Sequence, residues 1–421
     1  MHRRDILRLA GAVAALGAFG PAASAASGGR VVVVGGGFAG ATCAKYIRTW
    51  SPGTEVTLVE ASRDFISCPM SNRVIAGMLG MRDLTRNYRA LESRHGIRLV
   101  HDTVTAIDTD AREVRLASGA SLAYDRLVIA PGVDFAYETM PGLESAGAQR
   151  LMPHAWKAGP QTLDLRQRLT TLREGGVFAM HIPKVPFRCP PGPYERACLV
   201  ASAMKRFNPR GKVLVFDSNP DILAKRDLFF HSFVSEYKGI IEYIPNAGFE
   251  SANAAQGRVT FDVHGEVDAD LWNVIPPQRA GNVARTGGLA NVDNRWCEVD
   301  FLTYESRVVP NVHIIGDSIA SAPGTPKSGH MANQQAKVCA AAIAALLAGR
   351  APSDEPIIAN TCYSFVNDKE AMHVAGVYKF DAEKRTMVSV PGSGGLSPSS
   401  SSEEGFMAVA WIFNILNDTL S

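Results

Sequence analysis

The sequence predicts an α/β chain with two Rossmann-like dinucleotide-binding-type domains and a smaller C-terminal α+β domain. Three observations lead to this prediction. Val31 to Val34 form an apolar run that enters the glycine turn GGGFAG and a helical segment, and a second apolar run, EVTLVE, ends at Glu60. In the middle of the chain, GGVFAMHI and KVLVFDS repeat this order of strand, loop, helix and strand. Strands that alternate with helices predict parallel sheets covered by helices.

Residues 1–25 are expected to be an export signal that is not part of the fold. A basic head is followed by an apolar stretch and by Ala23-Ser24-Ala25, the A-x-A pattern of a cleaved signal. The pair Arg3-Arg4 resembles a twin-arginine signal, which bacteria use for proteins exported already folded around a cofactor. The alternative is a general secretory signal that holds two arginines. Either signal predicts that the mature protein lies in the periplasm.

The charge balance gives no reason to expect nucleic-acid binding. The chain has 43 Lys and Arg against 41 Asp and Glu, and removing residues 1–25, with three arginines and one aspartate, leaves 40 of each. The C-terminal apolar run GFMAVAWIFNIL has 12 residues, whereas a membrane-spanning helix needs about 20. We therefore predict no transmembrane span in the mature chain.

Seven cysteines are an odd count for an exported protein, so at least one is not paired with another cysteine of this chain. The oxidising periplasm permits disulfides among the rest. No context predicts a metal site, and the chain has no CxxCH haem motif. The cysteines are Cys43, Cys68, Cys189, Cys198, Cys297, Cys339 and Cys362.

The glycine turn matches GxGxxG at Gly35, Gly37 and Gly40. Glycines let the backbone approach a pyrophosphate, whose charge is stabilised by the N-terminus of the following helix. Glu60 stands 20 residues after Gly40, where an acidic side chain binds ribose hydroxyls. The alternative is a tight strand-to-helix turn without a ligand.

Two later segments indicate which dinucleotide binds. The run LVIAPG, with Ala130 and Gly132, resembles the strand-to-loop return of the two-dinucleotide-domain flavoproteins, and Gly316-Asp317 in VPNVHIIGDSIA is similar to their Gly-Asp pair. The resemblance implies a glutathione-reductase-like fold and FAD, with Asp317 at the ribityl-pyrophosphate. Val104, in the alternating stretch HDTVTAID, is also expected beside the cofactor.

The segment from Gly324 continues into an alanine-rich helical run after Gly329. In the family it resembles, this helix points its N-terminus at the flavin ring, where the helix dipole favours negative charge. Lys327 would add to that effect. The alternative is a solvated lysine in a loop.

The middle of the chain lacks the second GxGxxG of NAD(P)H-dependent relatives. Proline rings remove backbone donors and stiffen the loop, so we infer that the chain does not take electrons from NAD(P)H. The prolines of this turn are Pro183, Pro186, Pro190, Pro191 and Pro193.

Cys189 lies in this altered loop, next to Arg188. The neighbouring cation and the helix that begins after the loop are expected to lower the pKa of the thiol. One alternative is a buried structural cysteine, and another is a Cys189-Cys198 disulfide.

Three cysteines in their local contexts, Cys68 in SCPMSN, Cys189 in FRCPPGPYE and Cys362 in NTCYSFV, together resemble the flavoprotein subunit of flavocytochrome c sulfide dehydrogenase. The resemblance implies that Cys68 is joined to FAD by a thioether, and that Cys189 and Cys362 form a redox-active disulfide over the flavin. It also implies that Glu195 shuttles the proton of hydrosulfide. The alternative is a glutamate favoured in the first turn of a helix.

The resemblance implies a periplasmic FAD-dependent sulfide:cytochrome c oxidoreductase, which oxidises sulfide to sulfur or polysulfide. Because the chain has no CxxCH, its electrons are expected to pass to a c-type cytochrome subunit, in a heterodimer. Trp411 is placed near the flavin ring, with a core position as the alternative. The competing functions are a sulfide:quinone oxidoreductase-like enzyme, with GFMAVAWIFNIL at the membrane, and a non-catalytic flavoprotein that reactivates a sulfur-oxidising complex.

We predict an FAD-binding domain from residues 26–150 and 285–350, a second Rossmann-like domain from 151–284, and a C-terminal interface domain from 351–421. Cys43, Cys198, Cys297 and Cys339 are expected to be structural.

Overall fold

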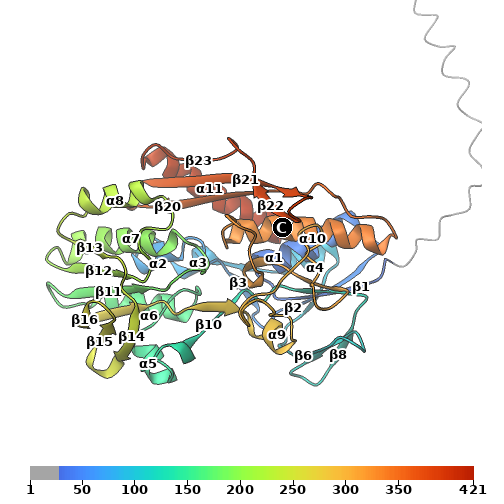
Figure 1. Cartoon of the computed structure of the whole chain (residues 1–421), viewed down its shortest axis with the longest axis horizontal. Coiled ribbons are helices and arrows are strands. Elements are labelled where there is room, and N and C mark those ends of the chain that lie inside the picture. The colour runs from blue at the N-terminus through green and yellow to red at the C-terminus, as the bar shows by residue number, and fades with distance from the viewer. Residues whose placement is uncertain (1–27) are drawn as a thin grey trace, which may run out of the picture.

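The computed structural model describes residues 28–421, so the predicted export signal, with Arg3 and Arg4, lies outside the described residues. Two parallel sheets stand side by side in the described chain (Figure 1). The first has the strand order β19-β9-β1-β2-β5, and every neighbouring pair is parallel. Its strands are β1 (Arg30–Val34), β2 (Glu55–Val59), β5 (Arg98–Val100), β9 (Arg126–Ile129) and β19 (Val312–Ile314).

The valines of β1 are buried at the centre of this sheet. Helix α1 (Phe38–Trp50) follows the glycine turn, and it packs against α10 (Gly329–Leu347). Small and branched side chains of both helices, such as Ala41, Ile47 and Ile343, form one apolar core with the strands. Burial of this core is the main favourable contribution to the stability of the first domain.

The second sheet has the order β13-β12-β11-β17, again all parallel. Its strands are β11 (Val177–Ile182), β12 (Lys212–Asp217), β13 (Ile241–Ile244) and β17 (Leu271–Val274), and its helices are α6 (Pro160–Thr170), α7 (Gly192–Phe207) and α8 (Arg226–Val234). The helices and the sheet enclose a separate apolar core, as expected for a second domain.

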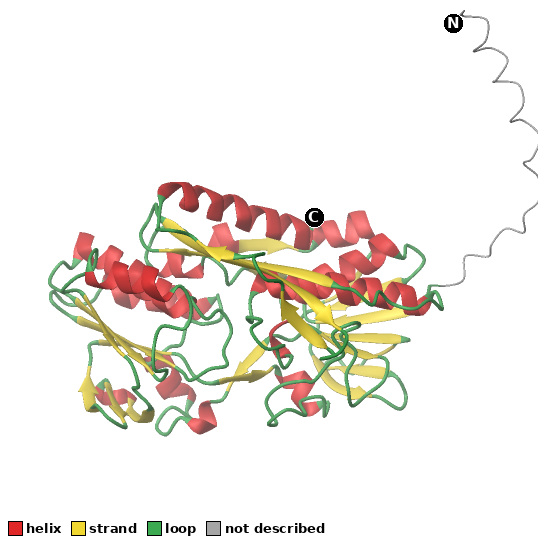
Figure 2. Cartoon of the chain, turned by 45° about the horizontal axis from the view of Figure 1, so that its top comes forward, coloured by secondary structure: helices red, strands yellow, loops and turns green. Residues whose placement is uncertain are grey.

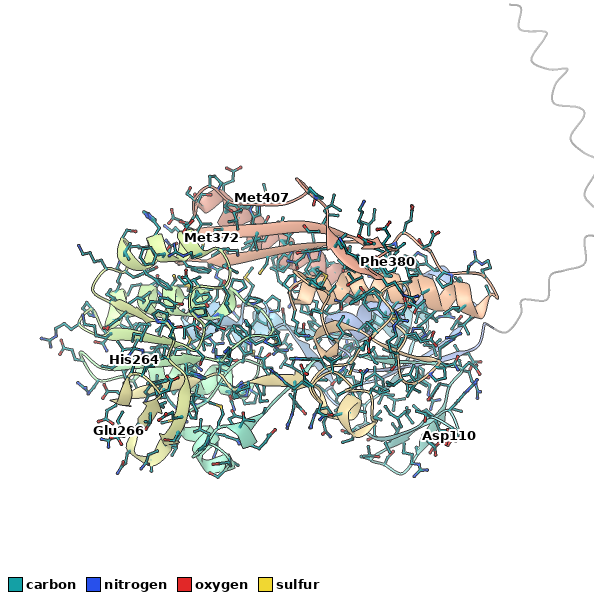
Figure 3. The ribbon with its side chains drawn as sticks, in the orientation of Figure 1. Asp110, His264, Glu266, Met372, Phe380 and Met407 are labelled. Carbon is teal, nitrogen blue, oxygen red and sulfur yellow. The ribbon has the colours of Figure 1, made fainter. Side chains whose placement is uncertain are left out.

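The C-terminal part is an antiparallel sheet that lies across both domains. It consists of β20 (Ile357–Phe365), β21 (Ala371–Asp381), β22 (Thr386–Ser389), β23 (Gly395–Leu396) and α11 (Ser402–Leu420). Helix α11 runs alongside these strands at the top of Figure 2 and packs against β21 and α1. Figure 3 labels Met372 and Phe380 at opposite ends of β21. Met372 belongs to the core of the second domain, whereas Phe380 packs near α10 of the first.

The remaining elements are short hairpins, helices and turns around the two sheets. The strands are β3 (Asp64–Ile66), β4 (Thr85–Asn87), β6 (Val104–Asp108), β7 (Glu113–Leu116), β8 (Ser121–Ala123), β10 (Val133–Phe135), β14 (Phe249–Asn253), β15 (Arg258–Phe261), β16 (Gly265–Asp268) and β18 (Gln278–Ala280). The helices and 3-10 turns are α2 (Ser71–Ile75), α3 (Met81–Leu84), α4 (Arg89–His95), α5 (Ala146–Leu151), α9 (Asn282–Thr286), η1 (Tyr137–Thr139), η2 (Ala254–Gln256) and η3 (Gly316–Ser318).

This architecture confirms the predicted α/β fold class with two Rossmann-like units and a C-terminal α+β part. The first sheet takes β19 from the chain that follows the second domain, which is how a discontinuous first domain is built. The domain boundaries themselves stay predictions. None of the helices within residues 28–421 combines the length and the apolar character needed to cross a membrane.

Candidate active site

The glycine turn between β1 and α1 is tightly packed on one side and open on the other. A Cβ atom at Gly40 would lie 1.8 Å from the carbonyl oxygen of Gly35, so no larger residue fits there. A Cβ atom at Gly37 would meet no atom within 4 Å. The carboxylate of Glu60 accepts an N–H of the turn at 2.7 Å. The open side at the N-terminus of α1 fits a pyrophosphate.

Ala130 and Gly132 bring the end of β9 to this turn. The carbonyl oxygen of Ala130 would lie 2.4 Å from a Cβ atom at Gly35, where φ is 99°. The Gly132 carbonyl accepts the N–H of Gly281 at 3.0 Å and the hydroxyl of Ser318 at 2.5 Å. The carboxyl ends of β1, β9 and β19 therefore meet where ligands bind in open α/β sheets.

The guanidinium of Arg188 joins three segments that are distant in sequence. Its Nη2 lies 3.5 Å from Cys68 Sγ, and its Nη1 lies 3.9 Å from Asp317 Oδ2. Cys189 is the next residue of the same loop. One cation therefore lies close to three predicted site residues. They are Cys68, predicted to bond FAD, Asp317, predicted to meet its ribityl-pyrophosphate, and Cys189 of the predicted reactive pair.

Lys327 is buried under η3, with 6% of its surface exposed. Its Nζ donates to the carbonyls of Asp317 (3.1 Å) and Ile319, and it lies 3.9 Å from the centre of the Trp296 ring. Burial lowers the pKa of Lys327 to about 8. The alternative of a solvated lysine is therefore wrong. Gly316, beside Asp317, has a φ of 78°, which favours glycine.

The remaining predicted cofactor residues, Trp411 and Val104, have different surroundings. Trp411, on α11, has its ring centre 5.9 Å from those of His330 and Tyr363. Within residues 28–421, the buried side-chain nitrogens Trp411 Nε1 and Gln278 Nε2 have no hydrogen-bond partner. Unsatisfied donors of this kind fit the carbonyl and ring-nitrogen acceptors of a flavin. Val104 is buried in the core of the first domain, and its cofactor contact stays a prediction.

The structure brings Cys189 and Cys362 together from different domains. Cys189 lies in the loop between β11 and α7, and its N–H donates to the Lys327 carbonyl at 2.8 Å. Cys362 lies on β20, its thiol neighbours that of Cys189, and its Sγ donates to the Tyr363 carbonyl at 3.8 Å. All seven cysteines of the chain are thiols in this structure. Two adjacent sulfurs can form a disulfide or exchange with an incoming thiolate.

The two thiols have opposite acidities. The neighbouring Cys189 thiol, together with the charge of Lys225, lowers the pKa of Cys362 to about 7 despite its burial. The neighbouring Cys362 sulfur and burial both raise the pKa of Cys189. The prediction that Arg188 lowers the pKa of Cys189 is therefore wrong, because its guanidinium turns to Cys68 and Asp317.

Glu195 lies in the first turn of α7, and it is buried beside the thiol pair. Its carboxylate accepts hydrogen bonds from Asn72 Nδ2 (2.7 Å) and from the N–H of Phe365 (2.9 Å). Burial raises the pKa of Glu195. A solvated glutamate at a helix N-terminus would have neither property, so the geometry favours the proton-transfer interpretation.

Sequence reasoning assigned no role to Asn72, Arg196 or Lys225. Arg196 is 1% exposed, and its Nε donates to Asn72 Oδ1 at 2.9 Å, which orients the amide that bonds Glu195. Lys225 lies against the strand of Cys362. Arg196 follows Glu195 in the sequence and Asn72 lies in the SCPMSN context of Cys68, so their positions could have marked them as site residues. No local pattern singles out Lys225.

The other four cysteines are buried in the apolar cores. Cys198 packs inside the second domain, while the Cys189 thiol contacts Cys362, so the geometry favours the Cys189-Cys362 pair over Cys189-Cys198. Cys43 on α1 and Cys339 on α10 lie in the same apolar core of the first domain. Their surroundings agree with the expected structural role.

Comparison with known families gives three matches along the chain. Residues 162–276 match the central region of the sulfide dehydrogenase (flavocytochrome c) flavoprotein chain, and residues 354–420 match the flavin-binding region of flavocytochrome c sulphide dehydrogenase. Residues 29–169 match the pyridine nucleotide-disulphide oxidoreductases.

Individual proteins give the same picture. The chain is 60% identical over 45 residues, 11% of its length, to the sulfide dehydrogenase (flavocytochrome c) flavoprotein chain of Chlorobaculum thiosulfatiphilum, of which it covers 94%. It is 25% identical over 320 residues to the mitochondrial sulfide:quinone oxidoreductase of Mus musculus, and this alignment spans 68% of this chain and 65% of that protein. The structure of the sulfide:quinone oxidoreductase from Aquifex aeolicus has a TM-score of 0.75 at 21% identity, with 92% of each chain covered, which supports the fold.

Proposed function

The chain belongs to the flavocytochrome c sulfide dehydrogenase flavoprotein family, and we propose that it oxidises sulfide in the periplasm and passes the electrons to a c-type cytochrome subunit. The observation that carries the proposal is the contact of Cys189 with Cys362, next to a buried carboxylate and a buried ammonium. In the oxidised enzyme these two residues form the disulfide that sulfide attacks.

In the first step, hydrosulfide forms a bond to the sulfur of Cys189 and breaks the Cys189-Cys362 bond. This leaves a persulfide on Cys189 and a thiolate on Cys362, with the negative charge of hydrosulfide conserved. A second hydrosulfide removes the outer sulfur as disulfane, and Cys189 is left as a thiolate. Re-forming the Cys189-Cys362 bond releases two electrons.

Glu195 accepts the proton that the persulfide or the released disulfane gives up when it ionises. A carboxyl group whose pKa is raised by burial holds a proton near neutral pH more readily than an exposed one. Asn72 and the Phe365 N–H hold its two oxygens in place. Phe365 lies on the same strand as Cys362, so the proton acceptor and the thiolate are held by one element.

FAD supplies, when bound, a two-electron acceptor that can release its electrons singly. The residues that would hold it are the glycine turn, Glu60 and Asp317, with Cys68 as the site of a thioether. Arg188 keeps Cys68 and Asp317 at one end of the site, and Lys327 holds η3 through the Asp317 carbonyl.

Anaerobic stopped-flow mixing with sulfide tests the proposal. Sulfide is expected to bleach the flavin absorbance, and the reduced protein is expected to reduce a c-type cytochrome. Cys189→Ser and Cys362→Ser should abolish bleaching, whereas Cys198→Ala, which removes a buried thiol outside the pair, should retain it. Wild-type flavin that stays oxidised in excess sulfide would refute the proposal.

A quinone is a second candidate for the electron acceptor, because α11 has an apolar outer face. Phe406 is 73% exposed, Phe413 52% and Met407 46%. Exposed apolar surface of this kind is typical of sites that bind a membrane or a partner protein. Reduction of a water-soluble quinone at a rate higher than that of the cytochrome, lost in a Phe406→Glu Phe413→Glu variant that still bleaches with sulfide, would favour this candidate.

A further inference from the structure

Lys225 is a buried cation at the junction of the second domain and the C-terminal sheet. It precedes α8 with a left-handed φ of 55°, and only 3% of its surface is exposed. Its Nζ lies 2.8 Å from the Cys362 carbonyl oxygen, 2.8 Å from Ser364 Oγ and 3.2 Å from the Met372 carbonyl oxygen. The three acceptors satisfy the three N–H donors of an ammonium, and all of them belong to β20 and β21.

None of these three partners carries a charge, and within residues 28–421 Lys225 forms no ion pair with a carboxylate. Burying a charge without a counter-charge is costly, so a purely structural role would be served better by an apolar side chain. Burial lowers the pKa of Lys225, and the groups whose negative charge opposes this shift are Cys362 first, then Glu195 of α7, Cys189 and Glu404 of α11.

Lys225 is bonded to the residue that carries one of the two sulfurs, and not to the other. Its Nζ donates to the backbone carbonyl of Cys362 itself, whereas Cys189 lies in the loop between β11 and α7 and forms no hydrogen bond with Lys225 within residues 28–421. When the disulfide opens, a fixed positive charge on the Cys362 side favours negative charge on that sulfur. In thiol–disulfide exchange, the sulfur that is better stabilised as a thiolate is the better leaving group.

We infer that Lys225 is the positioning residue that makes Cys362 the leaving thiolate and so directs the sulfur nucleophile to Cys189. The inference rests on the proposed function, since it assigns the roles within the same cysteine pair. It needs no further oxidant or reductant, because it concerns only which S–S partner keeps the electron pair when the bond breaks.

The test measures the two thiols without sulfide. The full-length protein with its flavin is reduced with a phosphine and alkylated with iodoacetamide over a pH series, and the peptides of Cys362 and Cys189 are quantified by mass spectrometry. In the wild type, Cys362 is expected to react first at pH 7. Lys225→Met is expected to raise the alkylation midpoint of Cys362 by about one pH unit or more, a tenfold change in acid dissociation.

Two further variants separate charge from packing. Lys225→Arg keeps the positive charge and should keep the low midpoint, and Lys238→Met, at an exposed lysine after α8, should leave it unchanged. An unshifted midpoint in folded Lys225→Met would overturn the inference. If that variant does not fold, the wild type still decides, because alkylation of Cys189 ahead of Cys362 at pH 7 contradicts the assignment.

The same variants distinguish failure of this inference from failure of the proposed function. The rate of flavin bleaching by sulfide should fall about tenfold in Lys225→Met, in proportion to the lost acidity of the leaving group. Lys238→Met should keep the wild-type rate. A wild type that shows the low Cys362 midpoint without any bleaching would reject sulfide as substrate and keep the role of Lys225.

Discussion

Replacing Glu195 with Gln removes the buried carboxylate and leaves the shape of the side chain almost unchanged. The amide oxygen can still accept the Phe365 N–H, but the amide nitrogen then faces Asn72 Nδ2, which keeps only its bond to the Gly192 carbonyl at 3.0 Å. Losing a hydrogen bond to a charged group costs about 1.5–3 kcal/mol, and the cost of burying the carboxylate disappears. We therefore expect the free energy of unfolding at pH 7 to change by less than about 2 kcal/mol.

The effect on the reaction should be larger than the effect on stability. A positioned proton acceptor contributes about 100-fold to 10,000-fold to a rate, so the rate of flavin bleaching by sulfide should fall by at least about 100-fold in Glu195→Gln. Stopped-flow absorbance at several pH values measures this rate. Glu403→Gln, at an exposed first-turn glutamate of α11, is the matched control and should keep the wild-type rate.

The pH dependence of stability gives an independent check on Glu195. Because burial raises its pKa, the folded protein holds this proton more tightly than the unfolded chain does. The resulting stabilisation is present at low pH and is lost as the pH rises from the ordinary glutamate value through the raised one. Chemical denaturation should therefore show the wild type losing stability relative to Glu195→Gln between pH 4 and pH 7.

Two results would refute this account of Glu195. Bleaching by sulfide within threefold of the wild-type rate at every pH would remove the proton-transfer role. A difference in stability between the two proteins that is the same at pH 4 and pH 7 would show that the pKa of Glu195 is not raised in the folded protein.

Three further outcomes test other parts of the site. Acid precipitation should leave the flavin with the wild-type protein but release it into the supernatant from Cys68→Ser; free flavin in both would rule out the thioether. Arg196→Met leaves four hydrogen-bond acceptors without their buried donor and should lower the free energy of unfolding by about 3–5 kcal/mol in denaturant titrations, with a smaller loss contradicting its structural role. Gly40→Ala should fail to fold with flavin because its Cβ would lie 1.8 Å from a carbonyl oxygen, whereas Gly37→Ala should fold and bind flavin more weakly; normal flavin content in both would contradict a pyrophosphate at this turn.

Much of the first domain could be predicted because its signals are local. The valine strand, the glycines and Glu60 lie within one unit of strand, turn and helix, and each residue type follows from backbone sterics or from the charge of a pyrophosphate. The resemblance of three short cysteine contexts also identified the residues that the fold brings to one site. Local signals of this kind do not depend on where the rest of the chain lies.

The acidity of Cys189 could not be predicted in the same way. Arg188 is its neighbour in sequence, yet the guanidinium turns toward Cys68 and Asp317, and the thiol is buried next to the Cys362 sulfur. Lys327 shows the same limitation, because its sequence context is compatible with a solvated loop but the chain folds over it. A pKa depends on burial and on charges in space, neither of which follows from adjacency in sequence.

The sequence by itself determined the fold class, the nucleotide-binding turn and the cysteines to be considered, since strand, turn and helix signals act over a few residues. The resemblance of the cysteine contexts predicted the Cys189-Cys362 pair, and only the tertiary structure decided that Glu195 is buried beside that pair and that Lys225 lies on its Cys362 side. These contacts join the second domain to the C-terminal sheet. Their energies depend on desolvation and on distances across that junction, which no local pattern encodes.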